Sequence, residues 1–417
     1  MKTGISVAEA RSLVLAATPP LGLETLPAGE ALGQVLGEDV VAGRTLPPHD
    51  VSAMDGFAVR AADLAAASPG APVALRLAFE VAAGGAAPQA LAPGEAARIL
   101  TGAAVPPGAD TVVRQEDARR EGGRVSIGLA PRLGENVRPA GEDLRAGERV
   151  LAAGRVLGPA ELGLLASLGR SIVSVHQRPR VALLSGGDEL VEPDGDTAGG
   201  RIVSSNSYAL TALCRRAGAE PRYLGIARDT PEALEEKLRA GLRADVLISS
   251  AGVSVGDRDY VRPVLERLGA ELVFWGVEMR PGHPLVFARF PGGGPLVFGL
   301  PGNPVSAMVT FELFVRPALR KLAGHRALFR PTLRVRLGET LRKAPGRLHF
   351  VRVRLERAGA GYLARSTGSQ SSGVLRSMSL AQGLLVFPAE AAELREGEEA
   401  VVQLLDDDFF LSEEPGF

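Results

Sequence analysis

The sequence predicts a multidomain protein in which an α/β domain with a doubly wound, largely parallel sheet accompanies separate β-rich regions. Three observations support this prediction. The chain has 417 residues, which is too long for one ordinary domain. Residues 173–326 alternate strand and helix patterns, an order typical of a parallel sheet with helices on both faces. Residues 327–417 carry only strand patterns, which indicate a small β-barrel or sandwich.

The remaining residues divide between two further predicted domains. An N-terminal or linker domain is discontinuous, and its helices are predicted at 6–16, around 28–36 and at 158–169. The region between its two parts is rich in Gly, Pro and Ala and has short alternating runs, which predict a small β-rich domain. The expected domains are 1–45 with 142–172 (helical or extended linker), 46–141 (β-rich), 173–326 (α/β) and 327–417 (β-barrel).

Apolar runs and amphipathic patterns locate the elements of the two C-terminal domains. In the α/β domain we expect strands at 180–184, 223–227, 245–250, 272–277, 285–290 and 296–300, and helices at 207–217, 231–242, 260–268 and 305–322. In the last domain we expect strands at 332–337, 350–355, 362–366, 384–387 and 400–404. Ligands of open α/β sheets bind at the carboxyl ends of the strands, so the site is expected there.

Composition excludes several classes of protein. The hydrophobic fraction is 46%, the charged fraction is 23% and the formal net charge is −1, so no global electrostatic attraction to nucleic acid or to an anionic membrane is expected, although a local basic pocket stays open. No apolar stretch approaches the roughly 20 residues of a membrane span, and the N-terminus does not resemble a signal peptide. The single cysteine, Cys214, lies in a helical pattern and is expected to be a buried structural thiol. A reducing, cytoplasmic location follows.

Three loops at predicted strand ends of the α/β domain share one chemical character. They are Ser185 to Glu189, Ala251 to Asp259 and Pro301 to Pro304, and each combines glycine with polar residues. Glycines free backbone N–H groups to face an anion, and a following helix adds partial positive charge. The acidic residues beside them would repel a phosphate unless a hard cation lies between. Together the loops predict a phosphate and Mg²⁺ at one edge of the sheet.

Each loop alone has a simpler interpretation. Asp257 or Asp259 can merely cap a helix, and Asn303-Pro304 can be an N-cap followed by a proline in the first turn. Asp229 has no obvious structural role because Thr230 is a good cap with Pro231 after it, yet Asp229 can itself cap with Glu232 as its partner. Convergence of three such loops on one sheet edge favours the functional interpretation.

Other candidate segments lie outside these loops. In the β-rich region Asp55 stands before glycine in an apolar setting, and Thr101-Gly102 follows a predicted strand. Residues 136–143 bring Arg138 near two carboxylates, Glu142 and Asp143. Residues 280–284 form a proline-bracketed turn with Arg280 and His283, which suits an oxyanion clamp. Any of these can instead be a plain surface turn. The sequence lacks a P-loop, a His-Glu-x-x-His motif and paired cysteines.

These segments, in this order, resemble the molybdopterin molybdenumtransferases, the family of bacterial MoeA and of the E domain of gephyrin. The resemblance rests on 52–57, 100–103 with 108–113, 136–143, 184–190, 205–206, 252–256 with 259–260, and 300–306, and it covers roughly residues 5–405. It implies an elongated protomer of four parts and a homodimer. It also implies an active cleft between the α/β and C-terminal domains of one subunit and the β-rich domain of the other.

The reaction implied by the resemblance is insertion of molybdate into adenylated molybdopterin, with release of AMP and a requirement for Mg²⁺. An upstream molybdopterin adenylyltransferase is the partner implied. Molybdate and tungstate both remain open as the physiological substrate ion. A dianion suits a pocket of Arg and backbone N–H groups, and Mg²⁺ held by carboxylates offsets charge that develops on phosphate oxygens.

The resemblance also implies residue roles. Catalytic positions carried over from the family are Asp55, Thr101, Asp143, Glu189 and Asp229. Metal positions are Glu189, Asp257 and Asp259. Positions for pterin, adenylate or molybdate are Ser185, Gly186, Asn206, Gly252, Ser254, Gly256, Arg280, His283, Pro301, Gly302, Asn303, Pro304, Arg352 and Ser372.

The sequence departs from the family pattern at three places. Arg280 and His283 stand where the family turn usually has two lysines, Ala251 stands where glycine is common, and Gly186 stands where threonine is usual. The first departure puts the fine positioning of molybdate in doubt. Two other interpretations stay open: a related α/β enzyme acting on a different nucleotide-bearing substrate, and a receptor scaffold like gephyrin. The acidic set Asp55, Glu189 and Asp229 favours catalysis, since a scaffold does not need buried carboxylates.

Overall fold

The structure is a computed structural model that describes residues 1–85, 87–250, 260–359, 361–412 and 415. The chain forms two compact units. Unit 1 contains the α/β domain and the C-terminal β-barrel, and unit 2 contains the β-rich region. Unit 1 consists of Met1–Gly37, Gly154–Pro159 and Ile172–Phe417, and unit 2 consists of Glu38–Ala153 and Ala160–Ser171.

The α/β domain is built on a seven-stranded sheet, and the prediction of a largely parallel sheet is confirmed. The only antiparallel pairings in its described part are those of β21 with its two neighbours. The N-terminal residues add an edge strand that the sequence patterns did not predict. In spatial order the strands are β1 (Lys2–Ile5), β19 (Glu271–Val277), β21 (Val286–Arg289), β22 (Leu296–Leu300), β18 (Val246–Ser250), β14 (Arg180–Gly186) and β17 (Glu220–Ala227).

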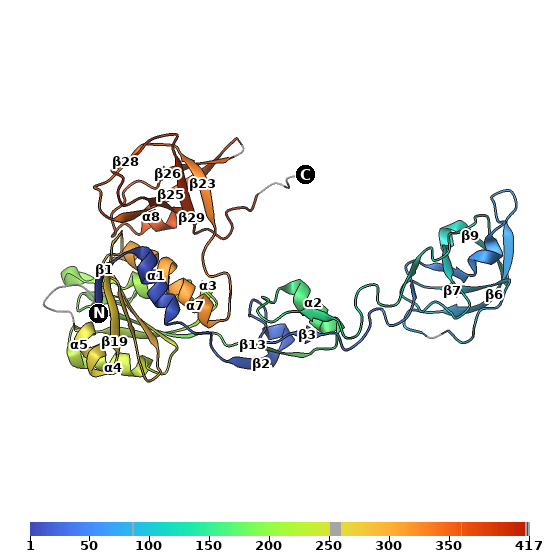
Figure 1. Cartoon of the computed structure of the whole chain (residues 1–417), viewed down its shortest axis with the longest axis horizontal. Coiled ribbons are helices and arrows are strands. Elements are labelled where there is room, and N and C mark those ends of the chain that lie inside the picture. Colours follow the sequence, from blue (N-terminus) through green and yellow to red (C-terminus); the bar gives the residue numbers. More distant parts are fainter. Residues whose placement is uncertain (86, 251–259, 360, 413–414, 416–417) are drawn as a thin grey trace. The chain divides into compact units, whose positions relative to one another are not determined.

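Helices cover both faces of this sheet (Figure 1). On one face lie α1 (Val7–Ala16), α3 (Ser205–Arg216) and a continuous helical stretch of α6 (Pro304–Thr310), a π-helical turn (Phe311–Val315) and α7 (Arg316–Leu322). On the other face lie α4 (Pro231–Gly241) and α5 (Val261–Arg267). The predicted helices are present because apolar residues recur at helical spacing, as Leu234 and Leu238 do in α4.

Cys214 confirms its predicted structural role. The side chain is fully buried in the core between α3 and the sheet. Burial raises the pKa of the Cys214 thiol to about 12. A thiol that stays protonated at physiological pH is a poor nucleophile, so Cys214 is a packing residue.

The C-terminal domain of unit 1 is a closed five-stranded barrel. Its strands pair in the order β25 (Leu348–Ala358), β26 (Gly361–Ser366), β23 (Thr332–Leu337), β29 (Glu399–Leu404) and β27 (Gly383–Phe387), and β27 pairs back to β25. The prediction of strands alone was incomplete, since a short helix, α8 (Arg376–Ser379), precedes β27. Strand β20 (Met279–Arg280) of the α/β domain also pairs with β25. A small sheet joins β24 (Leu341–Arg342) to β28 (Glu393–Leu394).

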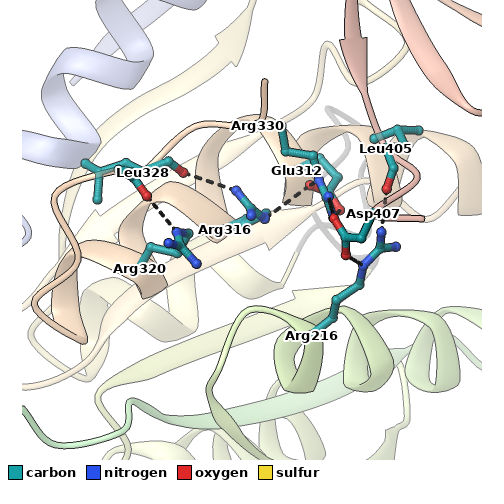
Figure 2. A network of polar contacts seen from close by, with 9 residues as sticks. Arg216, Glu312, Arg316, Arg320, Leu328, Arg330, Leu405 and Asp407 are labelled. Atoms are coloured by element: carbon teal, nitrogen blue, oxygen red, sulfur yellow. Dashed lines mark hydrogen bonds and ion pairs between the residues drawn. The ribbon is translucent and has the colours of Figure 1, made fainter. Parts of the chain in front are cut away.

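A buried charge network ties the end of the barrel to the α/β domain (Figure 2). Glu312, in the π-helical turn, accepts hydrogen bonds from Arg330 Nε at 2.8 Å and Arg330 Nη2 at 3.2 Å. Arg330 also pairs with Asp407, and Arg216 of α3 donates to Asp407 at 2.5 Å. Burial alone would raise the pKa of Asp407, but the hydrogen bonds from Arg216 and Arg330 outweigh it and the pKa is lowered. Arg330 and Glu312 are almost fully buried.

The predicted helix around 28–36 is wrong. Only a 3₁₀ turn, Ala28–Glu30, forms there. Gly33 has a φ of 77°, which no right-handed helix contains. The backbone N–H groups of Gly33 and Leu36 instead donate to Leu157 and Arg155 carbonyls. This segment therefore extends along residues 155–157, beside the two-stranded sheet of β2 (Leu23–Pro27) and β13 (Ile172–His176).

Unit 2 is β-rich, as predicted. Its main sheet has the order β8 (Thr111–Arg114), β5 (Gly56–Val59), β7 (Glu95–Ile99), β6 (Val73–Val81), β10 (Arg124–Ile127) and β9 (Ala118–Glu121). Two small pairs join β4 (Val51–Ser52) to β11 (Val137–Arg138) and β3 (Val40–Val41) to β12 (Arg149–Leu151). Helix α2 (Pro159–Ser167) begins at a proline, as its sequence predicted. Among the described helices, none has both the length and the apolarity needed to span a membrane.

Candidate active site

A pocket of about 430 Å³ lies at the carboxyl ends of β14, β18 and β22, which is where the sequence placed the site. Six of the predicted site residues line it: Glu189, Asn206, Pro301, Gly302, Asn303 and Pro304. The pocket is also lined by residues that sequence reasoning did not select: Leu190, Ile202, Val203, Ser204, Ser205, Ser250 and Pro284. Most of the added residues belong to β15 (Leu190–Val191), β16 (Ile202–Val203) and the start of α3.

Asn206 joins three elements of the pocket. Its side chain is 8% exposed, and Nδ2 donates to the Gly302 carbonyl at 2.8 Å. The same Nδ2 lies 3.3 Å from Oγ of Ser250, the last residue of β18. A buried amide held in this way is fixed in orientation. Asn206 thus couples the N-terminal end of α3 to the loop after β22 and to the end of β18.

The loop after β22 leads directly into helix α6. Asn303 is the N-cap of α6 and Pro304 is its first residue, which agrees with the capping interpretation of this dipeptide. The Asn303 side chain makes no capping hydrogen bond and lines the pocket instead. The backbone N–H of Val305 donates to the Ser372 carbonyl at 3.2 Å, so the barrel loop that carries Ser372 lies against the start of α6.

Glu189 lies on the pocket rim because the backbone before it turns sharply. Gly187 has a φ of 142°, and a Cβ atom there would lie 2.7 Å from both Glu189 carboxylate oxygens. Only glycine fits this position. The loop therefore folds the Glu189 carboxylate back toward the end of β14, where the predicted positions Ser185 and Gly186 lie.

Asp229 lies beside Asp188 at the adjoining strand ends. The N–H of Asp229 donates to Asp188 Oδ1 at 3.2 Å, and the N–H of Asp188 approaches Asp229 Oδ2 at 3.4 Å. Thr230, not Asp229, caps α4, since its side chain accepts from the Ala233 N–H at 3.2 Å. The alternative that Asp229 is the helix cap is therefore excluded. Asp229 does not line the pocket itself.

Arg352 is a fully buried cation on strand β25, next to the Ser372 loop. Its Nη2 donates to the Ser371 carbonyl at 3.1 Å and its Nε lies 3.1 Å from Ser377 Oγ. Its Nη1 has no hydrogen-bond partner among the described residues. Burial, and then the charge of Arg280, lower the pKa of Arg352 to about 10. Arg352 therefore remains a cation at neutral pH, and one of its buried donors has no hydrogen-bond partner among the described residues.

Arg280 adds a second positive charge at the same place. Strand β20 carries it alongside β25, where it pairs in register with His349. Burial, followed by the charges of Arg280, Arg352 and Lys343, lowers the pKa of His349 to about 4. His349 is consequently neutral at pH 7, and the cations of this cluster are the Arg and Lys side chains. Neither Arg280 nor Arg352 lines the pocket described above.

His283 is held by its own turn. Its Nδ1 lies 2.8 Å from the Val277 carbonyl and 3.8 Å from Glu278 Oε1, and its ring packs edge-on against Trp275. The side chain is 27% exposed. The neighbouring Pro284 lines the pocket, whereas His283 does not. The oxyanion role of His283 stays a prediction.

Two further predicted residues meet in unit 2. The backbone N–H and the hydroxyl of Thr101 both donate to Asp55 Oδ1 at 2.7 Å. The hydrogen bond from the Thr101 N–H, followed by that from its hydroxyl, holds the pKa of Asp55 below its usual value. Asp143, also in unit 2, is exposed. The guanidinium of Arg138 pairs with Glu142 at 2.5 Å, as its proximity in sequence suggested.

One expectation about the acidic residues is wrong. Asp55 and Glu189 are exposed and Asp229 is half-buried, so the acidic set does not consist of buried carboxylates. The physical reason is that each follows a strand end, where the chain leaves the sheet. Gly252, Ser254, Gly256, Asp257 and Asp259 lie outside the described residues. Among the described residues, no group of three or more His, Cys, Asp or Glu side chains is placed to hold a metal ion.

Three family models match the chain in succession. Residues 5–169 match the MoeA N-terminal region (domain I and II), residues 182–321 match a probable molybdopterin binding domain, and residues 334–405 match the MoeA C-terminal region (domain IV). The second of these models contains the strands and loops that form the pocket.

Individual proteins agree with the models. The chain is 42% identical over 376 residues to the molybdopterin molybdenumtransferase of Nostoc sp., covering 89% of this chain and 86% of the relative. It is 34% identical over 404 residues to that of Haemophilus influenzae, covering 96% and 98%. Two crystal structures of the molybdopterin biosynthesis MoeA protein from Pyrococcus horikoshii match with TM-scores of 0.82 and 0.79 at 32% and 31% identity, and cover 96% of this chain and 99% and 100% of theirs.

The fold, the pocket and these likenesses define a transferase of molybdenum cofactor biosynthesis. The three family models match one after another along a single chain, which identifies the family within this class of transferases. The chain belongs to the molybdopterin molybdenumtransferase family, which confirms the resemblance carried by its loops.

Proposed function

We propose that this chain inserts molybdate into adenylated molybdopterin in the cytoplasm, releasing AMP in a Mg²⁺-dependent reaction. One observation carries the proposal. A pocket that combines apolar side chains with amide and hydroxyl groups ends at the start of α6, and the Ser372 loop, which contacts the start of α6, also accepts a hydrogen bond from the buried Arg352. An organic ligand with many hydrogen-bonding groups fits the first part, and an oxyanion fits the free donor of Arg352.

The carboxylates that we propose as ligands are suited to Mg²⁺ as the required cation. Mg²⁺ in phosphoryl chemistry commonly keeps several waters and uses one or two carboxylates together with substrate phosphates. Glu189 on the pocket rim supplies such a carboxylate, and Asp257 and Asp259 are further proposed ligands. When bound, Mg²⁺ would neutralise charge on the phosphate oxygens of the adenylate.

Other residues of the chain would bind and orient the two substrates. Ser185, Asn206 and the loop Pro301 to Pro304 would bind and orient the pterin. Arg352 and Arg280 would hold molybdate by charge-assisted hydrogen bonds, with Ser372 beside them. Hydrogen bonds from Thr101 keep Asp55 ionised. The catalytic carboxylates at the adenylate would be those of Asp55, Asp143 and Asp229.

The wild-type protein, incubated with adenylated molybdopterin, Mg²⁺ and molybdate, should release AMP and metal-loaded pterin in equal amounts. AMP release that needs neither Mg²⁺ nor molybdate would refute the proposal.

Neutralising either exposed acid should slow this reaction. We expect Asp55→Asn and Glu189→Gln each to lower the rate of AMP release by about tenfold or more, as expected for loss of a metal or charge contact. Circular dichroism should remain native because both side chains are exposed. Glu236→Gln, an exposed change on α4, is the control and should keep the wild-type rate. Wild-type turnover in Asp55→Asn or Glu189→Gln would remove that residue from the site.

A homodimer is the proposed assembly. Asp55 and Thr101 belong to unit 2, whereas the pocket belongs to unit 1. A two-fold dimer lets one subunit complete the site of the other. Sedimentation at micromolar concentration should show one species near twice the 43.4 kDa chain mass. Mixing the slowed Asp55→Asn protein with the slowed Glu189→Gln protein should then raise the rate of AMP release, because a heterodimer contains one site with neither substitution. A fully active monomer would contradict this arrangement.

The charge at position 283 should affect molybdate use. Lysine, the usual family residue at this position, is a cation throughout the physiological range. If a cation at this position helps to hold molybdate, His283→Lys should lower the apparent molybdate constant relative to the wild type. Identical constants for the two proteins would show that position 283 does not bind the oxyanion through its charge.

A further inference from the structure

Tyr223 lies under the pocket on the edge strand β17, paired in register with Leu183 of β14. Its ring packs half-buried against the core beneath α3. Its hydroxyl donates to Glu192 Oε1 at 3.1 Å, and the side chains of Ser185, Ser204 and Ser207 lie close enough to act against the rise of its pKa. A single phenol is thus surrounded by polar groups from three separate segments.

Those three segments build one wall of the pocket. Ser185 ends β14, and Glu192 directly follows β15, the strand of the pocket-lining residue Leu190. Ser204 and Ser207 flank Ser205 and Asn206, which line the pocket at the start of α3. Tyr223 does not line the pocket. Any effect it has on a bound molecule therefore acts through these neighbours.

The serine hydroxyls form a buried cluster around the phenol. Ser185, Ser204 and Ser207 are almost completely buried. Ser204 Oγ lies 3.0 Å from Ser185 Oγ and 3.2 Å from Ser207 Oγ, and Ser207 Oγ donates to the Ser204 carbonyl at 2.7 Å. Burial raises the pKa of Tyr223, so its hydroxyl keeps the proton that it donates to Glu192. Each serine hydroxyl keeps a partner within this cluster, so the hydrogen bond that is lost with the phenol oxygen is the one to Glu192.

The segment 192–201, between β15 and β16, otherwise has little support. All of its residues are exposed. Its other side-chain hydrogen bonds lie within the segment: Arg201 donates to Asp196 at 2.7 Å and to the Ala198 carbonyl at 3.1 Å. The Glu192–Tyr223 hydrogen bond connects it to the sheet. A segment with few buried contacts opens locally at a low free-energy cost. Loss of the Glu192–Tyr223 hydrogen bond should therefore increase its local opening strongly.

We propose that Tyr223 is a positioning residue that holds the β15–β16 segment and the start of α3 in the shape that binds the pterin. The proposal deepens the function proposed above and rests on it for the identity of the ligand. Molybdopterin binding is the step affected, because the polar neighbours of the Tyr223 hydroxyl belong to the segments that build the pocket wall. The cationic group around Arg352 belongs to other elements and is left intact.

Tyr223→Phe tests this with the loss of a single oxygen. We expect the KM for adenylated molybdopterin to rise about tenfold while kcat stays within about twofold, as for loss of binding that is equal in the ground and transition states. Amide hydrogen exchange across 190–203 should become faster in the ligand-free variant. Glu192→Ala should share part of both effects, and Glu192→Gln, which keeps an acceptor, should restore most of the wild-type behaviour.

Tyr362→Phe is the matched control, since Tyr362 is a half-buried tyrosine in the barrel that packs on Phe409. It should leave KM, kcat and exchange at 190–203 unchanged. A Tyr223→Phe protein with wild-type KM and wild-type exchange overturns the proposal. So does a fall in kcat at unchanged KM, because it would place Tyr223 in the chemical step. If the wild type itself does not release AMP, the function proposed above fails, while the exchange measurement still decides the role of Tyr223.

Discussion

Replacing Glu312 by glutamine should lower the free energy of unfolding of unit 1 by about 3–5 kcal/mol. Glu312 is the buried anion that balances Arg330, and both side chains are at most 3% exposed (Figure 2). Glutamine keeps the shape but leaves the Arg330 charge buried with only Asp407 to neutralise it. Leaving one buried charge without its partner costs far more free energy than the intact ion pair contributes to stability.

Thermal unfolding followed by circular dichroism is the measurement, with Glu266→Gln as the control. Glu266 pairs with Arg262 on α5 at 3.1 Å, but both side chains are 50% exposed, so its loss should cost only about 0.5 kcal/mol. The double change Glu312→Leu with Arg330→Met should be milder than Glu312→Gln alone, because it removes both charges. A Glu312→Gln protein that melts with the wild type would show that the network in Figure 2 does not stabilise the barrel contact.

Arg352→Met should raise the apparent molybdate constant by about a hundredfold or more, the size of effect seen when a preorganised donor is removed from an anion site. The change removes the charge and the free Nη1 donor while filling much of the same buried space. Arg354→Met, an exposed change on the same strand, should leave the constant unchanged.

A change in pH offers a test of Arg352 in the unmodified protein. Since the pKa of Arg352 is about 10, the cation is present below that pH and is lost above it. Molybdate affinity should therefore hold through neutral pH and fall as the pH approaches 10. Arg352→Lys keeps a charge but not the planar fork, and should lie between wild type and Arg352→Met. If native Arg352→Met binds molybdate normally, Arg352 is a structural cation only.

The sequence predicted the α/β core well because its elements carry local patterns. The three Gly-containing loops could be assigned to one sheet edge, since the carboxyl ends of parallel strands share that edge. Asn206, Gly302 and Asn303 do line one pocket there. The remainder of the pocket wall was missed because Ile202, Val203 and Ser250 have no motif of their own. The place of Ile202 and Val203 depends on β15 pairing with β16, a contact between short strands that no periodicity reveals.

Other features depended on tertiary contacts. The helix expected at 28–36 gave way to hydrogen bonds with residues 155–157, which lie far away in sequence. The exposure of Asp55 and Glu189 could not be inferred from the apolar residues next to them, because both lie between strands, where the path of the loop depends on tertiary contacts. The cationic group of Arg280 and Arg352 arises from the pairing of β20 with β25, which joins two domains. Only the family resemblance connected those two residues beforehand.

Strand β1 has a consequence for how the protein is made. Lys2, Thr3 and Ile5 pair with residues of β19, so β1 is synthesised roughly 270 residues before its partner strand exists. Until then the apolar side of α1 has no sheet to cover. Translation should therefore produce a nascent chain in which β1 and α1 are vulnerable to proteases until the α/β sheet is complete.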